Sequence, residues 1–127
     1  LPGRFERIHT KREWYFSGSH NQQAVLALME GVNGLKSKNA VLILSMLKDK
    51  VTLPVLEPLQ GFSTIYYYDQ KTERAAGFSK IRPYLSAIEM DESAVKTILN
   101  ELSSSVVIFA GSFYFYPIVK RWLSQID

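Results

Sequence analysis

The sequence predicts an α/β fold: an open, mixed but mostly parallel sheet with helices on both faces. Short apolar runs typical of buried strands alternate along the chain with segments whose apolar residues recur every three or four positions, and turn residues separate the two. The chain has 127 residues, 46% of them hydrophobic and 21% charged, which is enough for one packed core. We therefore expect a single domain over residues 1–127.

The first half of the chain contains three expected strands. Residues 13–16 form an aromatic run that ends at a Ser-Gly-Ser turn, residues 40–47 are nearly all aliphatic, and residues 63–68 are rich in Ile and Tyr. A helix over 21–35 joins the first two, because its apolar residues fall on one stripe. This stripe consists of Val25, Leu28, Met29, Val32 and Leu35. Residues 51–59 carry two prolines, which predicts an interrupted helix.

The second half repeats this alternation. The sequence predicts a short helix over 79–85, a brief strand over 87–90, a helix with Asp91 as its N-cap, and a buried strand over 106–110. The helix after Asp91 has the apolar positions Val95, Ile98, Leu99 and Leu102. A last helix, which tolerates a proline in its first turn, presents Ile118, Val119, Trp122, Leu123 and Ile126 on one face.

Three polar clusters follow expected strands: residues 17–21, the pair Asp49-Lys50 and the pair Gly111-Ser112. The carboxyl ends of parallel strands lie at one edge of a sheet, where open α/β sheets bind ligands. Two of the clusters are strand-to-helix turns, whose free backbone N–H groups and helix dipole favour anions. The pattern therefore predicts a phosphate or carboxylate site at this edge.

His20 is the sharpest single candidate, because a histidine in such a turn can present one ring nitrogen to a ligand. The competing interpretation is a histidine that caps the helix or bonds a nearby carbonyl. His9 lies in a charged stretch with Lys11 and Arg12, so we interpret it as part of a solvated face. No second histidine or acidic residue stands at ligand spacing, and we expect no metal site.

Several functions are disfavoured by composition and motif. The 15 basic and 12 acidic residues give a net charge of only +3, spread along the chain, so we expect no nucleic-acid partner. The longest apolar run is interrupted by Gly111-Ser112 and is too short to cross a bilayer, so we expect no membrane association and a cytoplasmic protein. The absence of cysteine excludes disulfides. The first residues resemble a linker, and we expect a domain excised from a longer chain.

Catalytic motifs of other classes are missing. The flanks of Gly111-Ser112 do not form the G-x-S-x-G turn of hydrolases, and no G-x-x-x-x-G-K-[ST] loop occurs. If the protein handles ATP, another domain must hold most of the triphosphate. The three tyrosines at 66–68 alternate between the two faces of a strand and are interpreted as packing residues, and Asp49-Lys50 is, taken alone, an ordinary surface ion pair.

Four short motifs, taken in order, resemble one family. They are residues 2–6 (PGRFE), 17–21 (SGSHN), 46–50 (MLKDK) and 110–114 (AGSFY). Together they resemble the C-terminal domain of folylpolyglutamate synthase/dihydrofolate synthase, the folate branch of the Mur ligase superfamily, whose C-terminal domain is Rossmann-like. The order and spacing of the motifs span the whole chain.

The resemblance implies an ATP-dependent amide ligase with Mg²⁺. Such an enzyme phosphorylates a carboxylate of dihydropteroate or of a folate glutamate tail, and the amino group of L-glutamate attacks the acyl phosphate. An N-terminal ATPase domain, the implied partner, carries the P-loop, the metal ligands and most of the folate pocket. The resemblance thus implies that the isolated domain is inactive, and we expect the protein to be a monomer.

The resemblance also implies roles for particular side chains. ATP contact falls to Arg4, Ser17 and Asn21, catalysis to His20, glutamate binding to His20 and Ser112, and anion contact to Asp49 and Lys50.

One departure from the family motif bears on the nucleotide. The family has Asp at the position of Ser17 and Ala at that of Ser19. A serine replaces at most part of a carboxylate's contact, and a lost charge-assisted hydrogen bond costs about 1.5–3 kcal/mol. This departure leaves a non-catalytic binding module of the same fold as an alternative. A cell-wall Mur-type ligase is a second alternative, which the motifs fit less well.

Overall fold

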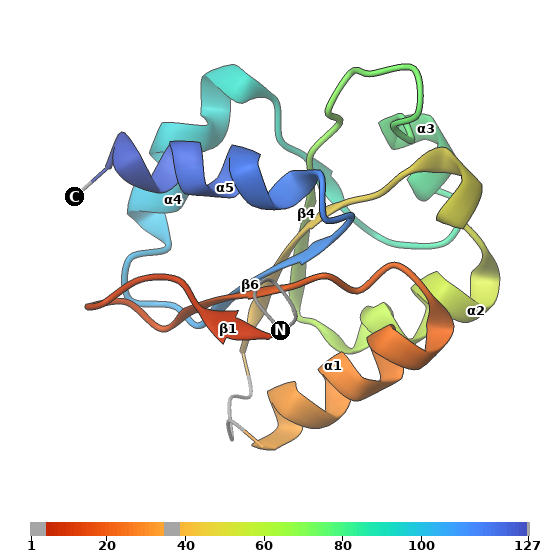
Figure 1. Ribbon diagram of the computed structural model, residues 1–127, viewed down its shortest axis with the longest axis horizontal. Coiled ribbons are helices and arrows are strands. Elements are labelled where there is room, and N and C mark those ends of the chain that lie inside the picture. The colour runs from red at the N-terminus through yellow and green to blue at the C-terminus, as the bar shows by residue number, and fades with distance from the viewer. Residues whose placement is uncertain (1–4, 35–38, 127) are drawn as a thin grey trace.

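A six-stranded sheet runs through the middle of the molecule in a computed structural model that describes residues 5–34 and 39–126 (Figure 1). The strand order is β1-β2-β6-β3-β4-β5. The β1–β2 pair is antiparallel and all other neighbours are parallel. The strands are β1 (Glu6–Arg7), β2 (Trp14–Ser17), β3 (Val41–Ser45), β4 (Thr64–Tyr67), β5 (Ile88–Glu89) and β6 (Val107–Gly111). The predicted mixed, mostly parallel α/β fold is confirmed.

Helices lie on both faces of this sheet. They are α1 (Gln22–Gly34), α2 (Leu53–Leu56), α3 (Phe78–Ile81), α4 (Val95–Glu101) and α5 (Phe115–Ser124), with the 3₁₀ helices η1 (Lys48–Lys50), η2 (Glu57–Gly61) and η3 (Glu92–Ala94). In Figure 1, α1 and α2 lie below the sheet and α4 and α5 above it. No helix in the described ranges is long and apolar enough to span a membrane.

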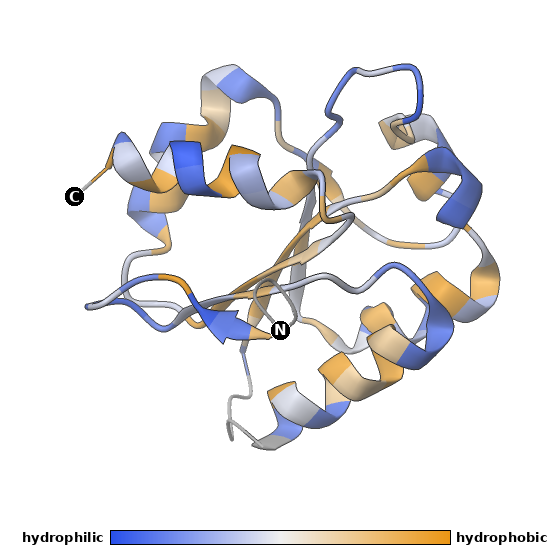
Figure 2. Cartoon of the chain, viewed as in Figure 1, coloured by the Kyte–Doolittle hydropathy of each residue, from blue (hydrophilic) through white to orange (hydrophobic). Residues whose placement is uncertain are grey.

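The aliphatic run of β3 is explained by burial on both faces. Leu42 and Leu44 belong to the core under α1 and α2, while Val41 and Ile43 belong to the core under α4 and α5. Side chains alternate across a strand, so a strand between two helical layers needs apolar residues at every position. Each such side chain contributes about 1.5–3 kcal/mol when fully buried. The helices that cover the sheet have one apolar face. In Figure 2, hydrophobic and hydrophilic positions alternate along α5, as expected for a helix with one face on the core and the other in solvent.

The carboxyl ends of β2, β6 and β3 lie level with one another. Ser17 pairs with Ala110 and Ser45 pairs with Gly111. Gly111 has a φ of +126°, and a Cβ there would overlap the Ser45 carbonyl oxygen, so only glycine fits. The next amide, that of Ser112, donates to the same carbonyl at 3.0 Å. These contacts bring the turns after β2 and β6 to one edge of the sheet.

Helix ends follow the predicted caps and prolines. Asp91 accepts a hydrogen bond from the Ala94 amide at 3.1 Å, although the first turn after it is the 3₁₀ helix η3, which leads into α4. The two prolines of segment 51–59 each stand in the first turn of a separate short helix, α2 and η2. The predicted interrupted helix is therefore confirmed.

Three local expectations were wrong. The strand β1 was not predicted, because two residues carry no periodicity. The strand over 40–47 ends at Ser45, and Leu47 instead bridges to Ala75. His9 is not part of a solvated face: it is half-buried, packs edge-on against Trp14, and its Nδ1 accepts the amides of Lys11 and Arg12 at 3.0 and 3.1 Å.

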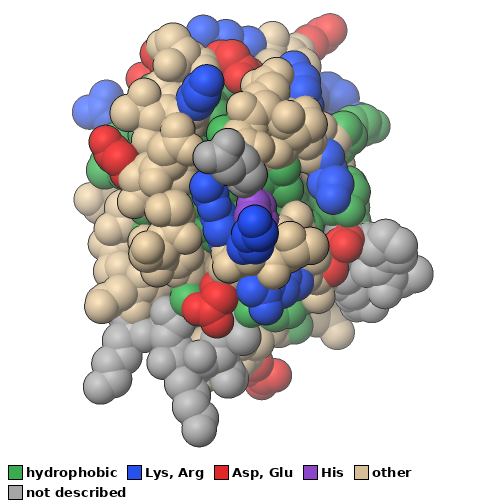
Figure 3. All heavy atoms as spheres, turned by 90° about the vertical axis from the view of Figure 1, so that its left-hand side faces the viewer, with side chains coloured by type: hydrophobic (Ala, Val, Ile, Leu, Met, Phe, Trp, Pro, Cys, Tyr) green, Lys and Arg blue, Asp and Glu red, His purple; other side chains and the backbone are tan. Residues whose placement is uncertain are grey.

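His9 therefore organises the hairpin turn between β1 and β2. Figure 3 views the molecule from the side to which this hairpin projects, and shows Lys and Arg side chains gathered around a histidine. Arg12 lies over the Trp14 ring with its Cζ 4.7 Å from the ring centroid. Lys11 and Arg12 thus lie at the amino end of β2, opposite the edge where the predicted ligand site lies.

Candidate functional site

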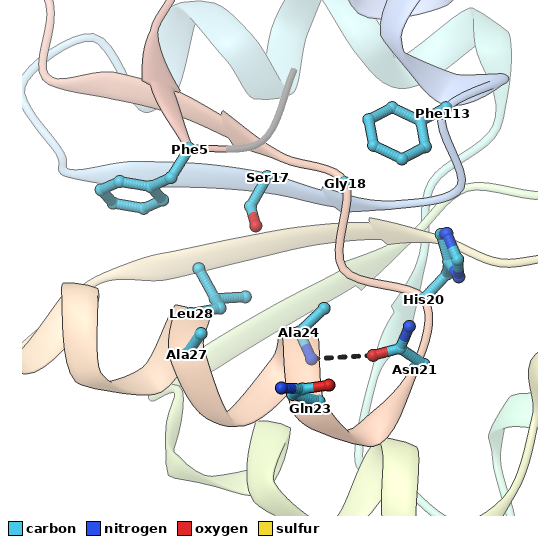
Figure 4. Close-up of a pocket in the computed structure, with 10 residues that line it drawn as sticks. All are labelled: Phe5, Ser17, Gly18, His20, Asn21, Gln23, Ala24, Ala27, Leu28 and Phe113. Atoms are coloured by element: carbon cyan, nitrogen blue, oxygen red, sulfur yellow. Dashed lines mark hydrogen bonds between the residues drawn. The ribbon is translucent and has the colours of Figure 1, made fainter. Parts of the chain in front are cut away.

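A pocket of about 590 Å³ lies at the carboxyl edge, between the β2–α1 turn, α1 and the β6–α5 turn (Figure 4). Its lining consists of Phe5, Ser17, Gly18, His20, Asn21, Gln23, Ala24, Ala27, Leu28 and Phe113. Figure 4 shows the rings of Phe5 and Phe113 on opposite sides of it, with the amide of Gln23 on α1 and that of Asn21 just before the helix begins. Three of the predicted site residues, Ser17, His20 and Asn21, therefore line one pocket.

His20 stands in the turn between β2 and α1 with one nitrogen unsatisfied. Its Nδ1 is buried and has no hydrogen-bond partner among the described residues, and its ring packs edge-on against Phe113 with centroids 5.8 Å apart. An unsatisfied buried polar group costs about 1–3 kcal/mol, and such groups in native structures call for an explanation. A ligand hydrogen bond would satisfy this nitrogen.

Asn21, not His20, caps α1. Its Oδ1 accepts the Ala24 amide at 2.8 Å, the bond drawn in Figure 4. The interpretation of His20 as the capping residue is therefore wrong. Because the Asn21 oxygen is used in the cap, only its NH₂ group is left to donate to a ligand.

Ser17 is buried at the end of β2, with 4% of its surface exposed. Its hydroxyl is hydrogen-bonded to the hydroxyl of Ser19, which is 2% exposed. The two positions at which the chain departs from the family motif are thus partners of each other. The pair forms a neutral, self-satisfied end to the strand.

Gly18 and Phe113 shape the pocket together. A Cβ on Gly18 would overlap the Phe113 ring, so glycine is required for this ring to lie against the β2–α1 turn. Phe113 is nevertheless 49% exposed, and it forms one wall of the pocket. Phe113 stands in the AGSFY motif of residues 110–114, but the sequence alone predicts no role for its ring.

The other predicted residues lie elsewhere. Ser112 is 2% exposed, and its Oγ accepts the Tyr114 amide at 3.0 Å, so it supports the β6–α5 turn and does not line the pocket. Asp49 and Lys50 lie in η1, away from the pocket lining, and neither forms an ion pair with a described residue. Arg4 lies outside the described residues.

Among the described residues that line the pocket, none carries a carboxylate, lysine or arginine group, and His20 is the one ionisable side chain. Over the described ranges, no group of three His, Cys, Asp or Glu side chains could hold a metal ion. What the pocket offers is a histidine nitrogen, two amides and aromatic walls, which suit a small ligand that accepts hydrogen bonds.

These features define a class: an open α/β domain with a small-ligand pocket at the carboxyl edge of its parallel strands. Within this class, the chain is similar to solved structures of folylpolyglutamate synthase/dihydrofolate synthase. The Yersinia pestis enzyme, in complex with AMPPNP and a manganese ion, is 23% identical with a TM-score of 0.82, over 98% of this chain and 32% of that one.

Two further structures agree. Escherichia coli FolC in complex with ADP is 21% identical with a TM-score of 0.83, again over 98% and 32% of the two chains. Folylpolyglutamate synthase from Thermotoga maritima is 18% identical with a TM-score of 0.74, over 97% and 30%. This chain thus spans about a third of the length of each. No family model and no curated protein matches it. The resemblance predicted from the four motifs is confirmed, as a resemblance of fold.

Proposed function

We propose that this chain is the C-terminal domain of an ATP-dependent ligase that joins L-glutamate to a folate or dihydropteroate carboxylate through an acyl phosphate. The similar structures cover this chain almost completely and include one with AMPPNP, manganese and L-glutamate bound. The observation that carries the proposal is the pocket at the sheet edge that His20 lines, together with the His20 Nδ1, which no described residue satisfies.

The pocket is chemically incomplete, and this supports a second domain. Among the described residues, its lining offers no carboxylate to act as a base and no lysine or arginine. The described residues do not fit a Mg²⁺ site. We assign the metal and most of the triphosphate to an N-terminal ATPase domain of the same protein, whose closure over this edge would exclude water from the acyl phosphate.

In this proposal each side chain has a limited task. His20 hydrogen-bonds the incoming glutamate, Asn21 donates from its NH₂ group to the nucleotide, and Ser17 offers a hydroxyl to it in place of a carboxylate. Arg4 contacts ATP. The remaining proposed residues act from the flanks: Ser112 serves glutamate binding by holding the β6–α5 turn. Asp49 and Lys50, in η1, contact an anionic group of the substrates in this proposal.

A specific observation supports one alternative. The hydroxyls of Ser17 and Ser19 satisfy each other, so the end of β2 is closed without a ligand. A non-catalytic binding module with this fold would need no carboxylate at position 17. The cell-wall ligase has no comparable support.

The direct test is ADP release by the intact protein with ATP, Mg²⁺ and L-glutamate. Dihydropteroate and a reduced folate are compared as acceptors, with a no-acceptor control. The proposed ligase releases ADP only when an acceptor is present, and the preferred acceptor shows which carboxylate is activated. The absence of acceptor-dependent release would favour the binding module.

A further inference from the structure

The orientation of the His20 ring is not fixed by a hydrogen bond from any described residue. The contact that the structure gives this ring is with Phe113, against which it packs edge-on with the centroids 5.8 Å apart. A histidine that serves a ligand needs a defined ring orientation, which a hydrogen bond to its other nitrogen often supplies. Here an aromatic contact takes the place of that hydrogen bond.

Phe113 has the fixed backbone position that such a contact requires. Its carbonyl oxygen accepts the Tyr116 amide at 3.1 Å. The amide of the preceding residue, Ser112, donates to the Ser45 carbonyl at 3.0 Å. Phe113 is thus tied on one side to the end of β3 and on the other to the first turn of α5.

The Phe113 ring also lies directly against the β2–α1 turn, which carries His20. A Cβ on Gly18 would overlap the ring, so the ring occupies the space that a side chain at position 18 would take. Figure 4 shows the ring next to both Gly18 and His20. One side chain from the β6–α5 turn therefore contacts two residues of the β2–α1 turn.

Burial alone does not explain an aromatic residue at this place. Phe113 is 49% exposed, so it gains only part of the stability that a fully buried ring provides. Its neighbour Tyr114 is 60% exposed and contacts the Arg74 guanidinium, away from the pocket lining. These two exposed aromatic residues of one turn differ in what they contact, and they form a matched pair for experiment.

We propose that Phe113 is a positioning residue, which holds the His20 imidazole in the orientation that hydrogen-bonds the ligand. The proposal deepens the proposed function and rests on it for the identity of that ligand, L-glutamate. Phe113 itself contacts no reacting atom in this proposal. It acts through His20, and the β6–α5 turn acts on the pocket through Phe113.

Ligation assays of the intact protein test the proposal by separating the two substrates. F113A should raise the KM for L-glutamate about three- to tenfold, the change expected for loss of an edge-on ring pair, and should leave the KM for ATP unchanged. In the H20A background F113A should change the KM for L-glutamate less than about twofold, because the residue through which it acts is gone. Y114A is the matched control and should keep both KM values within about twofold of wild type, as for an ordinary surface substitution.

Two kinetic results would overturn the proposal. One is a rise in the KM for ATP as large as that for L-glutamate, which would indicate a general loss of the pocket. The other is an equal effect of F113A with and without His20, which would mean that Phe113 acts on the ligand directly.

NMR of the ligand-free protein tests the same contact without ligation. F113A should shift the imidazole resonances of His20 and leave those of His9 in place, because a ring current acts only on near neighbours, and Y114A should move neither. Unchanged His20 resonances in F113A would overturn the proposal, since the two rings would then not be in contact.

The proposed function fails separately. If wild type shows no acceptor-dependent ADP release, the ligase is refuted, and the His20 resonances alone decide whether Phe113 holds this ring. If release is normal and the His20 resonances do not move in F113A, the ligase stands and the positioning role does not.

Discussion

The hydroxyls of Ser17 and Ser19 hydrogen-bond to each other at the carboxyl end of β2. Both are buried, and both replace residues of the motif that the chain otherwise resembles. A polar group that finds its partner two residues away has no need of a ligand to satisfy it. The pair therefore explains how this strand ends stably without a carboxylate.

This relationship predicts an energetic coupling between the two serines. The single variants S17A and S19A each leave one buried hydroxyl without its partner, and the double variant leaves none. A double-mutant cycle from urea unfolding should give a coupling energy of about 1 kcal/mol. Additive effects of the two substitutions would show that the hydroxyls do not interact in solution.

Restoring the carboxylate should change nucleotide affinity. In S17D the new carboxylate can accept the Ser19 hydroxyl and still offer an oxygen to the nucleotide, so we expect ATP to bind more tightly by about tenfold, within the range of a charge-assisted hydrogen bond. The control is S17N, which has a similar shape and no charge. Unchanged or weaker ATP binding in S17D would mean that serine in place of aspartate does not weaken nucleotide binding.

The contact between Gly18 and Phe113 predicts a specific rescue. G18A places a Cβ in the Phe113 ring, so the ring must move and the pocket loses a wall. We expect a loss of stability of about 1 kcal/mol, the lower end of the range for overpacked sites, because the Phe113 ring is half exposed and can move. The double variant G18A/F113A should recover most of this loss by thermal unfolding but should not recover ligand binding. A G18A protein as stable as wild type would place the ring elsewhere.

Alanine substitution should impair ligation at His20 and stability at His9. H20A removes a buried nitrogen without a partner, so it should leave the free energy of unfolding nearly unchanged while reducing ligation by about a hundredfold or more. H9A removes the acceptor of two backbone amides and should destabilise the protein by about 1–2 kcal/mol. Near-normal turnover in H20A would refute its proposed role.

Tyr68 predicts a loss of stability at alkaline pH. Burial, and then the hydrogen bond to the Glu92 carboxylate at 2.8 Å, raise the pKa of Tyr68 to about 12. In the unfolded chain a tyrosine has a pKa of about 10. The neutral hydroxyl thus stabilises the fold fully below pH 10, and this contribution is lost as the pH rises from 10 through about 12.

The variant Y68F isolates this effect. At pH 8 it should be less stable than wild type, because the bond to Glu92 is missing, and the difference should shrink between pH 10 and 12. Other titrating groups affect both proteins alike, so the difference reports Tyr68 alone. A difference that stays constant over this range would contradict the raised pKa.

The layers of the fold follow from sequence pattern more directly than the site does. Burial on both faces explains why the run ending at Ser45 could be recognised as a central strand. Tyr66 and Tyr67 show the limit of the same reasoning: Tyr67 is buried and Tyr66 is half-buried, as strand alternation predicts. The next tyrosine is buried as well, because it follows the end of β4 and its ring packs against Phe115 and Trp122.

The roles of neighbouring residues in the site could not be separated by sequence. A turn of Ser, Gly, His and Asn offers several capping and ligand-binding groups. Only the structure shows that Asn21 caps α1 while the His20 Nδ1 has no partner among the residues described. Phe113 was missed for a similar reason. An aromatic residue in a loop carries no periodicity, so its part in a pocket depends on segments distant in sequence.

The two histidines of the chain serve as probe and control for ligand binding in the pocket at the sheet edge. The imidazole NMR resonances of the protein are followed during titration with L-glutamate and AMPPNP. The His20 resonances should shift as the pocket fills, while those of His9, at the opposite end of β2, should stay in place. If both histidines are unaffected at saturating ligand, or if His9 moves as much as His20, the pocket is not the binding site.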